Sequence, residues 1–372
     1  MPSRTDSPAA LLPSLPEGAR VLVIRLRSLG DSLLLTPALQ ALKQWRPDLR
    51  ISVLLYQRFA PILEGNPDVD ELLPLDPEGP AATISIAQMT ARLRERRFAA
   101  CFNLHGGTLS AWLAWTSGAS HRVGWRRFRF GFVYTAVAPD PHSVLGRTRV
   151  HSVEDQLSLF QWAGLPPGPI GPLRIFPQAA ARAAVAEKLA RAGLSHGSRY
   201  AVLHPVSRII TQDWPAESYA AVARALEEEH NLVPVVHCGP GEGAKLEAIA
   251  RFHSRPLVRV EELNIPELVA LIEGAALFVG VDSGPAHIAA ALARPVVVLF
   301  GSMDSAVWGP WRSEHQIVQN YYSCNPCRGD RCYAFERPEC ILSITPAQVR
   351  AAIQKLLAPA KSERVVLPTR AG

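Results

Sequence analysis

Residues 279–311 read VGVDSGPAHIAAALARPVVVLFGSMDSAVWGPW, and this stretch decides the fold. An apolar run over 277–281 predicts a buried strand, and the turn Asp-Ser-Gly-Pro follows at 282–285. An Ala-rich helix is expected over 286–293 and a second apolar strand over 296–300. A strand, a turn, a helix and a strand at this spacing form a βαβ unit, which joins parallel strands. The stretch therefore predicts a parallel sheet covered by helices.

The turn after the first of these strands is a candidate site for an anionic ligand. Gly284 lets a ligand approach the backbone closely, and Pro285 suits the first position of the helix. The free N–H groups and the positive dipole end of that helix attract a diphosphate. Asp282 stands at the carboxyl end of the strand, where we expect its carboxylate to contact hydroxyls of the attached group. The alternative is a plain helix cap, because Asp and Ser are preferred at that position.

The rest of the chain repeats the same alternation. Apolar strand candidates occupy residues 21–26, 51–55, 98–104 and 122–124, then 200–203, 232–237 and 257–260, with helical patterns between them. A stretch rich in Pro and Gly, 164–177, separates the two halves, and 372 residues suffice for two domains. We therefore predict two doubly wound domains. The first 20 residues lack a signal-peptide core and are expected to be a disordered leader, and residues 358–372 a frayed tail.

Composition narrows the class of protein. Hydrophobic residues make up 48% and charged residues 19%, as in a globular chain. The net charge of +6, from 39 basic and 33 acidic residues, fits an anionic substrate or an anionic membrane surface. The nearest approach to a nucleic-acid-binding run, RRFR at 126–129, is more typical of a solvated loop, so no nucleic-acid partner is expected. No apolar stretch reaches the length of a spanning helix, which predicts a cytoplasmic protein.

The segment DSGPAHIAAAL at 282–292, followed by PVVVLFG at 295–301, resembles the signature of the ADP-heptose:lipopolysaccharide heptosyltransferases, glycosyltransferase family 9. The resemblance covers about residues 20 to 355 and implies an α/β fold of GT-B architecture, in which two Rossmann-like parallel-sheet domains face each other across a cleft. The expected division is a leader at 1–19, an acceptor-side domain at 20–177, a donor-nucleotide-binding domain at 178–345, and a closing helix and tail at 346–372. Asp282, Ser283, Gly284 and His287 are then donor-binding residues.

A carboxylate also stands at the first strand-to-helix turn. The segment IRLRSLGDSLLLTPAL at 24–39 resembles the amino-terminal motif of the same family, in which the Asp after Gly is the proposed general base. On that resemblance Asp31 takes the proton from an attacking sugar hydroxyl. Helix capping is the alternative. Pro37 either kinks the following helix or marks its true start.

Two further segments resemble parts of the family's donor site. HPVSRIITQDWP at 204–215 is similar to a loop whose hydroxyls and a Lys two residues before Trp-Pro contact the phosphates. Here that position is Gln212, which can donate hydrogen bonds but has no charge, so Ser207 and Arg208 are the other candidates. Glu242 follows the Gly-Pro-Gly turn at 239–241, where the family has a Glu that contacts the ribose or base. A solvent loop and a plain turn are the alternatives.

Four cysteines cluster late in the chain, with the spacing C-x2-C-x4-C-x7-C. An opening C-x2-C is typical of zinc or iron–sulfur sites, but the following spacing is not that of a standard finger. Reduced thiols or a disulfide pair are equally compatible, and we assign the cluster no catalytic role. Its members are Cys324, Cys327, Cys332 and Cys340.

The leading hypothesis is an inverting glycosyltransferase that needs no cofactor and moves heptose from ADP-heptose to a lipopolysaccharide inner-core acceptor. Its partners would be a nucleotide sugar and a lipid-linked glycan, with peripheral contact at the cytoplasmic face of the inner membrane. Two alternatives stay open: a GT-B transferase using another nucleotide sugar for a different glycan, and a non-catalytic nucleotide-sugar-binding protein, which Gln212 suggests. A Rossmann oxidoreductase is disfavoured because G-x-G-x-x-G is absent.

Overall fold

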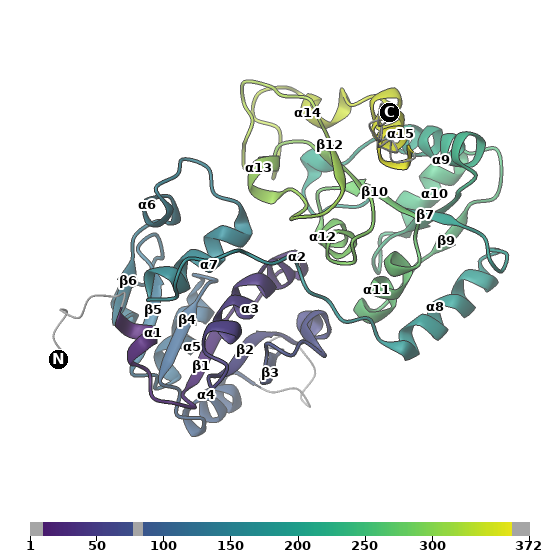
Figure 1. The fold of residues 1–372 in the computed structure, drawn as a ribbon. Helices are drawn as coiled ribbons and strands as arrows, with labels where there is room; N and C mark the ends of the chain where they lie inside the picture. The colour runs from purple at the N-terminus through teal and green to yellow at the C-terminus, as the bar shows by residue number, and fades with distance from the viewer. Residues whose placement is uncertain (1–9, 77–84, 359–372) are drawn as a thin grey trace, which may run out of the picture.

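The computed structural model describes residues 10–76 and 85–358, which form two α/β halves (Figure 1). Each half is built on a six-stranded sheet in which every pair of neighbouring strands is parallel. The strand orders are β3-β2-β1-β4-β5-β6 and β12-β11-β10-β7-β8-β9. The predicted fold class, two Rossmann-like domains of an α/β protein, is confirmed.

The first half contains the strands β1 (Arg20–Ile24), β2 (Arg50–Tyr56), β3 (Glu71–Leu75), β4 (Ala100–Asn103), β5 (His121–Trp125) and β6 (Ala136–Ala138). Its helices are α1 (Leu11–Ser14), α2 (Leu29–Leu34), α3 (Thr36–Trp45), α4 (Ile86–Glu95), α5 (Thr108–Thr116), α6 (Pro141–Leu145) and α7 (Ser152–Trp162), with short 3-10 turns η2 (Gln57–Leu63) and η3 (Gly131–Val133). The central strands are apolar and buried on both faces, as parallel strands under two helix layers must be. Pro37 lies in the first turn of α3 and marks its start, because proline needs no N–H partner there.

The second half contains β7 (Tyr200–His204), β8 (Val233–His237), β9 (Val258–Val260), β10 (Leu277–Val281), β11 (Val296–Phe300) and β12 (His315–Gln319). Its helices are α8 (Ala179–Arg191), α9 (Ala216–His230), α10 (Gly243–Arg251), α11 (Ile265–Glu273), α12 (Gly284–Ala291), α13 (Ser305–Trp308), α14 (Glu339–Leu342) and α15 (Pro346–Leu357), with a 3-10 turn η4 (Ile210–Gln212). The sequence analysis missed β3, β6 and β12. Each lies at the edge of a sheet or is partly exposed, so it lacks the continuous apolar run of a central strand.

The expectation of a disordered leader over 1–19 is wrong for residues 10–19. Leu11 and Leu12 of α1 are buried in the first core, and the Leu12 N–H donates to the Ala163 carbonyl at 2.9 Å. The Arg46 guanidinium donates to the carbonyls of Leu12 and Leu15, both at 3.2 Å, which holds this segment against α3. Apolar burial therefore orders a segment whose composition resembles a leader. Residues 1–9 and the expected tail at 359–372 lie outside the described residues.

α8 and α15 both pack within the second half. α8 packs on α11, and ion pairs join Arg182 to Glu273 and Lys188 to Glu267. α15 packs on α9 and on the β11–β12 edge of the sheet. None of the described helices combines the length and the apolar character needed to cross a bilayer.

The two halves meet at the first turns of α2 and α12, which lie side by side (Figure 1). A Cβ atom at Gly30 would lie 2.9 Å from Cδ2 of His287 and 3.5 Å from the Cα of Gly284. A Cβ atom at Gly284 would lie 2.9 Å from Cδ2 of Leu29. Two glycines therefore allow the helix starts to approach more closely than any larger residue would. A second contact is the hydrogen bond between Nε2 of His151 and the Gly309 carbonyl, 2.9 Å long.

We expect Gly30→Ala to loosen this junction, because its methyl group would overlap the His287 ring. Amide hydrogen exchange in the first turns of α2 and α12 should accelerate, while exchange in β1 and β10 stays slow. Gly168→Ala is the matched control, since a Cβ at Gly168 has no heavy atom within 4 Å. Unchanged exchange at both helix starts in Gly30→Ala would show that the junction tolerates a side chain there.

Candidate active site

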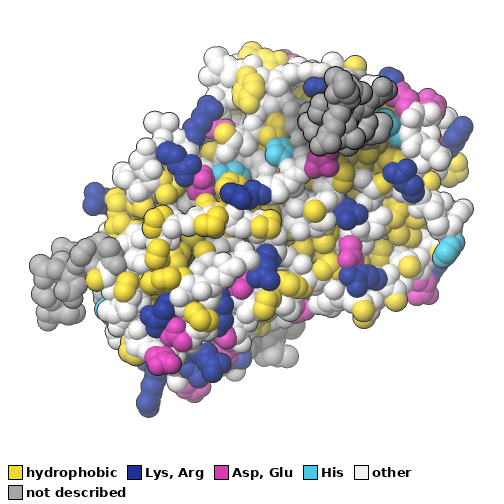
Figure 2. Space-filling model, in the orientation of Figure 1, with side chains coloured by type: hydrophobic (Ala, Val, Ile, Leu, Met, Phe, Trp, Pro, Cys, Tyr) yellow, Lys and Arg dark blue, Asp and Glu magenta, His cyan; other side chains and the backbone are white. Residues whose placement is uncertain are grey.

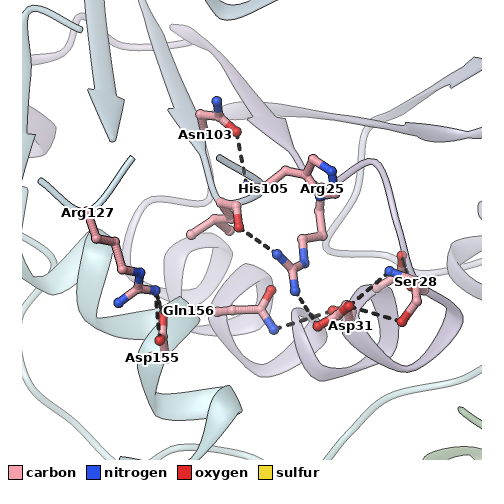
Figure 3. Close-up of polar contacts among 10 residues, drawn as sticks. Arg25, Ser28, Asp31, Asn103, His105, Arg127, Asp155 and Gln156 are labelled. Atoms are coloured by element: carbon pink, nitrogen blue, oxygen red, sulfur yellow. Dashed lines mark hydrogen bonds and ion pairs between the residues drawn. The ribbon is translucent and has the colours of Figure 1, made fainter. Parts of the chain in front are cut away.

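Asp31 lies in the first turn of α2, beyond the carboxyl end of β1, and its carboxylate is held by two neighbours (Figure 3). Ser28 donates to Oδ2 from its backbone N–H and from its hydroxyl, each at 3.0 Å. Arg25 forms an ion pair with Oδ1, and its Nη1 donates to the Leu104 carbonyl at 2.6 Å. Gln156 Nε2 donates to the backbone carbonyl of Asp31 at 3.3 Å. These contacts tie α2 to the end of β4 and to α7, and so fix the position of the carboxylate.

The charge state of Asp31 follows from its partners. Burial alone would raise the pKa of the carboxyl, but the charge of Arg25 and the hydrogen bonds from Ser28 outweigh burial. The pKa of Asp31 therefore lies below its ordinary value of 3.8, and the group is a carboxylate at neutral pH. The helix-capping alternative is also realised, because Ser28 is the N-cap of α2 and bonds to Asp31 three residues on. The role of general base stays a prediction.

Two histidines lie near Asp31, one from each half of the protein. Burial lowers the pKa of His287, on α12, to about 4, with a further lowering by His151 and an opposing effect of Asp31. Burial, and then the charges of Arg25 and Arg27, lower the pKa of His105 to about 4, and Asp31 opposes them. Both rings are therefore neutral at pH 7. Nδ1 of each ring is buried and has no hydrogen-bond partner among the described residues.

In the second half, Gln212 joins Ser207 to Asp282 in a chain of hydrogen bonds. Its Nε2 donates to Oδ2 of Asp282 at 2.9 Å, and its Oε1 accepts from the Ser207 hydroxyl at 2.6 Å. The whole Gln212 side chain is buried. Burial raises the pKa of Asp282 to about 7, and the Gln212 hydrogen bond offsets only part of this effect. Gln212 thus contacts a carboxyl in this structure, where the resemblance predicted a contact with phosphate.

The remaining predicted donor-binding residues lie in turns after β7, β8 and β10, three adjacent strands. Ser283 is the N-cap of α12 and Gly284 its first residue, so their turn presents the helix N-terminus. Arg208 is exposed and forms no ion pair with any described residue. Glu242 accepts a hydrogen bond at 2.8 Å from the N–H of Gly239 and so closes its own turn. The sheet brings these turns to one edge, as expected of a doubly wound domain.

Sequence reasoning assigned no role to several residues that the fold brings into the site. Arg25 had a local signal, because an arginine beside an apolar strand is unusual and implies a partner. Gln156 on α7 contacts Asp31, which is 125 positions earlier in the chain, and His151, the N-cap of α7, contacts Gly309, which is 158 positions later. Nothing near either residue in the sequence indicates these contacts. Histidine and Lys or Arg side chains gather where the two halves meet in Figure 2. The junction therefore carries the polar groups that catalysis or binding would use.

The four late cysteines surround one small cavity, together with Thr211 and Phe335. None of the four forms a disulfide bond in this structure. Among residues 10–76 and 85–358, no group of three or more His, Cys, Asp or Glu side chains is arranged to hold a metal ion.

Comparisons with known proteins identify the family. The sequence model for glycosyltransferase family 9 (heptosyltransferase) matches residues 86–336. Lipopolysaccharide heptosyltransferase 3 of Escherichia coli K12 is 31% identical over 351 residues, covering 88% of this chain and 95% of that protein. A glycosyltransferase family 9 structure from Veillonella parvula superposes with a TM-score of 0.80 at 22% identity, covering 92% and 98% of the two chains. An E. coli heptosyltransferase solved with ADP-2-deoxy-2-fluoro heptose superposes with a TM-score of 0.64 at 19% identity, covering 90% and 99%.

The matched region spans more than half of the chain and includes the turn with Asp282 and the Gln212 loop. The identity to lipopolysaccharide heptosyltransferase 3 extends over nearly the whole of both proteins. The chain therefore belongs to glycosyltransferase family 9, the heptosyltransferases.

Proposed function

We propose that this glycosyltransferase moves heptose from ADP-heptose to a lipopolysaccharide core acceptor, with inversion at the anomeric carbon. The observation that carries the proposal is the meeting of the α2 and α12 N-termini, since it places a fixed carboxylate, Asp31, beside an anion-binding helix start. The relative at 31% identity is a lipopolysaccharide heptosyltransferase, and a structure of the same fold was solved with a fluorinated ADP-heptose. Both support this choice of donor and acceptor class.

In the proposed mechanism, a residue of the acceptor-side half carries out the proton transfer. The Asp31 carboxylate accepts the proton of the acceptor hydroxyl as that oxygen attacks the anomeric carbon on the face opposite the diphosphate. Arg25 stabilises the anionic form of Asp31 and so lowers the pKa of its carboxyl. Asp31 is therefore a weaker base, but it is ionised at neutral pH and can accept a proton there. Ser28 engages Oδ2 and Arg25 engages Oδ1, so the proton is accepted by a remaining lone pair on one of these two oxygens.

The donor-side half binds the leaving group. We assign the diphosphate to the N–H groups at Ser283 and Gly284 and to Arg208, whose exposed guanidinium is free to form a bidentate contact. Charge that develops on the departing ADP is stabilised there. Asp282 contacts hydroxyls of the heptose. Glu242 gives up its hydrogen bond from the Gly239 N–H and binds the ribose or base instead. His287, neutral and with Nδ1 free, lies between the two halves and can bond either substrate.

Asp31→Asn should lower kcat by roughly two to four orders of magnitude, the usual effect of removing a general base. Binding of ADP, measured by calorimetry, should stay within about threefold of the unmodified protein, because the donor turns are in the other half. Thermal stability should fall, since the variant leaves the buried Arg25 charge without its partner. A Ser28→Ala variant, which keeps the carboxylate, is the control and should lose far less activity. If both variants retain comparable activity, Asp31 is a helix cap only.

Arg25→Gln should move the acid limb of the pH profile. Removing the neighbouring cation leaves burial to raise the pKa of Asp31, so the base becomes protonated at higher pH. In the unmodified protein the loss of kcat/KM on acidification should lie below the ordinary range of an aspartate, and in the variant it should move to higher pH. If the acid limb of kcat/KM lies at the same pH in the variant and the unmodified protein, the ionisation that controls the rate is not that of Asp31.

Gln212→Lys should change how donor binding depends on pH. In the unmodified protein Asp282 ionises around pH 7, so affinity for ADP-heptose should fall about three- to tenfold from pH 6 to 8 as a negative charge appears near the diphosphate. A Lys at 212 would lie against Asp282 and lower its pKa, so the affinity should become flat over that range. Calorimetry with the sugar nucleotide measures this, and Asp282→Asn is the control that should also be flat. A slope that persists in Asp282→Asn would assign it to another group.

A further inference from the structure

Two exposed tryptophans stand on one face of α5. Trp112 is 48% exposed and Trp115 55%, whereas Ala111, Leu113 and Ala114 are buried on the opposite face. The two indole rings touch edge to face, with centroids 5.4 Å apart. A helix at the surface of a water-soluble protein normally turns polar residues outward, whereas α5 is apolar on its buried face and aromatic on its exposed face.

The neighbouring turn η3 extends this surface. α5 packs beside η3, where Phe132 is 84% exposed and its ring meets Phe130 at 6.3 Å. We call Trp112, Trp115, Phe130 and Phe132 together the aromatic ridge. Phe132 is the most exposed large hydrophobic residue among the described residues. Such a cluster marks an interaction surface.

Positive charge is concentrated in the part of the sequence that contains the ridge. Residues 86–135 contain eight arginines and a single acidic residue, Glu95, a net charge of +7, whereas the whole chain carries +6. The remainder of the chain is therefore close to neutral. Some of these arginines pair internally, as Arg96 does with Glu71. Arg126 and Arg129 are exposed and form no ion pair with any described residue, and Arg129 lies against the ring of Phe130, 5.8 Å from its centroid.

We propose that the aromatic ridge and its arginines dock the protein onto the surface of an anionic lipid bilayer. Trp and Phe side chains partition into the headgroup region, where an aromatic ring is partly buried and its polar edge stays hydrated. Arginines beside them are attracted to anionic headgroups, and the two effects add. A second protein would need a complementary acidic surface, whereas a bilayer supplies negative charge and an apolar layer side by side.

The place of the ridge in the fold suits this partner. α5 begins at Thr108, directly after the carboxyl end of β4, whose neighbour Leu104 accepts the hydrogen bond from Arg25. The first turn of α5 therefore adjoins the acceptor-side half of the proposed site, and the two tryptophans of the ridge follow along the same helix. An acceptor attached to lipid would reach Asp31 without leaving the membrane surface. Docking is independent of the proposed chemistry, since it needs neither donor nor acceptor, although it adds a partner to that function.

Sedimentation with lipid vesicles tests the proposal on the full chain. We expect binding to vesicles that contain about 30% phosphatidylglycerol in phosphatidylcholine and much weaker binding to pure phosphatidylcholine. Raising the salt from about 0.1 to 0.5 M should weaken binding, because the arginine contribution is screened. Trp112→Ala with Trp115→Ala should lower the partition coefficient roughly tenfold or more. Arg126→Ala with Arg129→Ala should lower it about ten- to thirtyfold.

Phe252→Ser with Arg251→Ala provides the matched control. It removes an exposed aromatic side chain and an exposed arginine from the end of α10 in the other half. Its binding should stay within about twofold of the unmodified protein. Thermal midpoints should be unchanged in all variants, because the replaced side chains are exposed.

Three results would overturn the proposal. One is failure of the unmodified chain to bind anionic vesicles. Another is equal binding by the ridge variants and the unmodified chain. The third is self-association that the ridge variants abolish in the absence of lipid, which would make a second copy the occupant. Transfer to a lipid-free acceptor fragment, assayed in parallel, should be unaffected in the ridge variants. If the unmodified chain shows no transfer to this fragment, the proposed function is contradicted, but the result of the vesicle experiment is unaffected.

Discussion

The contact between the starts of α2 and α12 is the constraint on which the site depends. Parallel strands end at the same edge of their sheet, so each half presents its helix N-termini and its turns at one edge. Gly30 and Gly284 let the two edges approach until the backbone of one helix nearly touches that of the other. Asp31 and His287, which come from different halves, influence one another only because of this approach. A larger residue at either glycine would move the two helix starts apart.

The two carboxyls at the junction are tuned in opposite directions by their surroundings. Both are buried enough for burial to raise their pKa, but Asp31 has Arg25 as a partner and Asp282 has only the amide of Gln212. A full charge overcomes the cost of desolvation, and a neutral hydrogen-bond donor does not. One group is therefore ionised well below neutral pH, while the other titrates close to it. Two carboxyls with separated pKa values can take different roles in one reaction.

Gln212 takes part in the hydrogen bonding of the donor-side half, but it adds no positive charge there. The side chain is buried and bonded at both ends, to Ser207 and to Asp282. A cation at this position would compensate the carboxylate as Arg25 does in the other half. The only cationic side chain of the same loop, residues 204–215, is then the exposed Arg208. Arg208 thus supplies positive charge at the proposed diphosphate site, and the arginines near α5 supply it at the proposed membrane-docking surface.

The sequence by itself determined the βαβ alternation, the family and the turns that hold Asp31, Asp282 and Ser283, because these depend on local spacing and on the fixed carboxyl edge of parallel strands. It missed the edge strands and the ordering of α1, since their stability comes from neighbours distant in the chain. Only the tertiary structure decided which partners the carboxyls have. Arg25 and Gln212 act through contacts whose direction no local pattern reveals, and the burial that shifts a pKa exists only once the chain has folded.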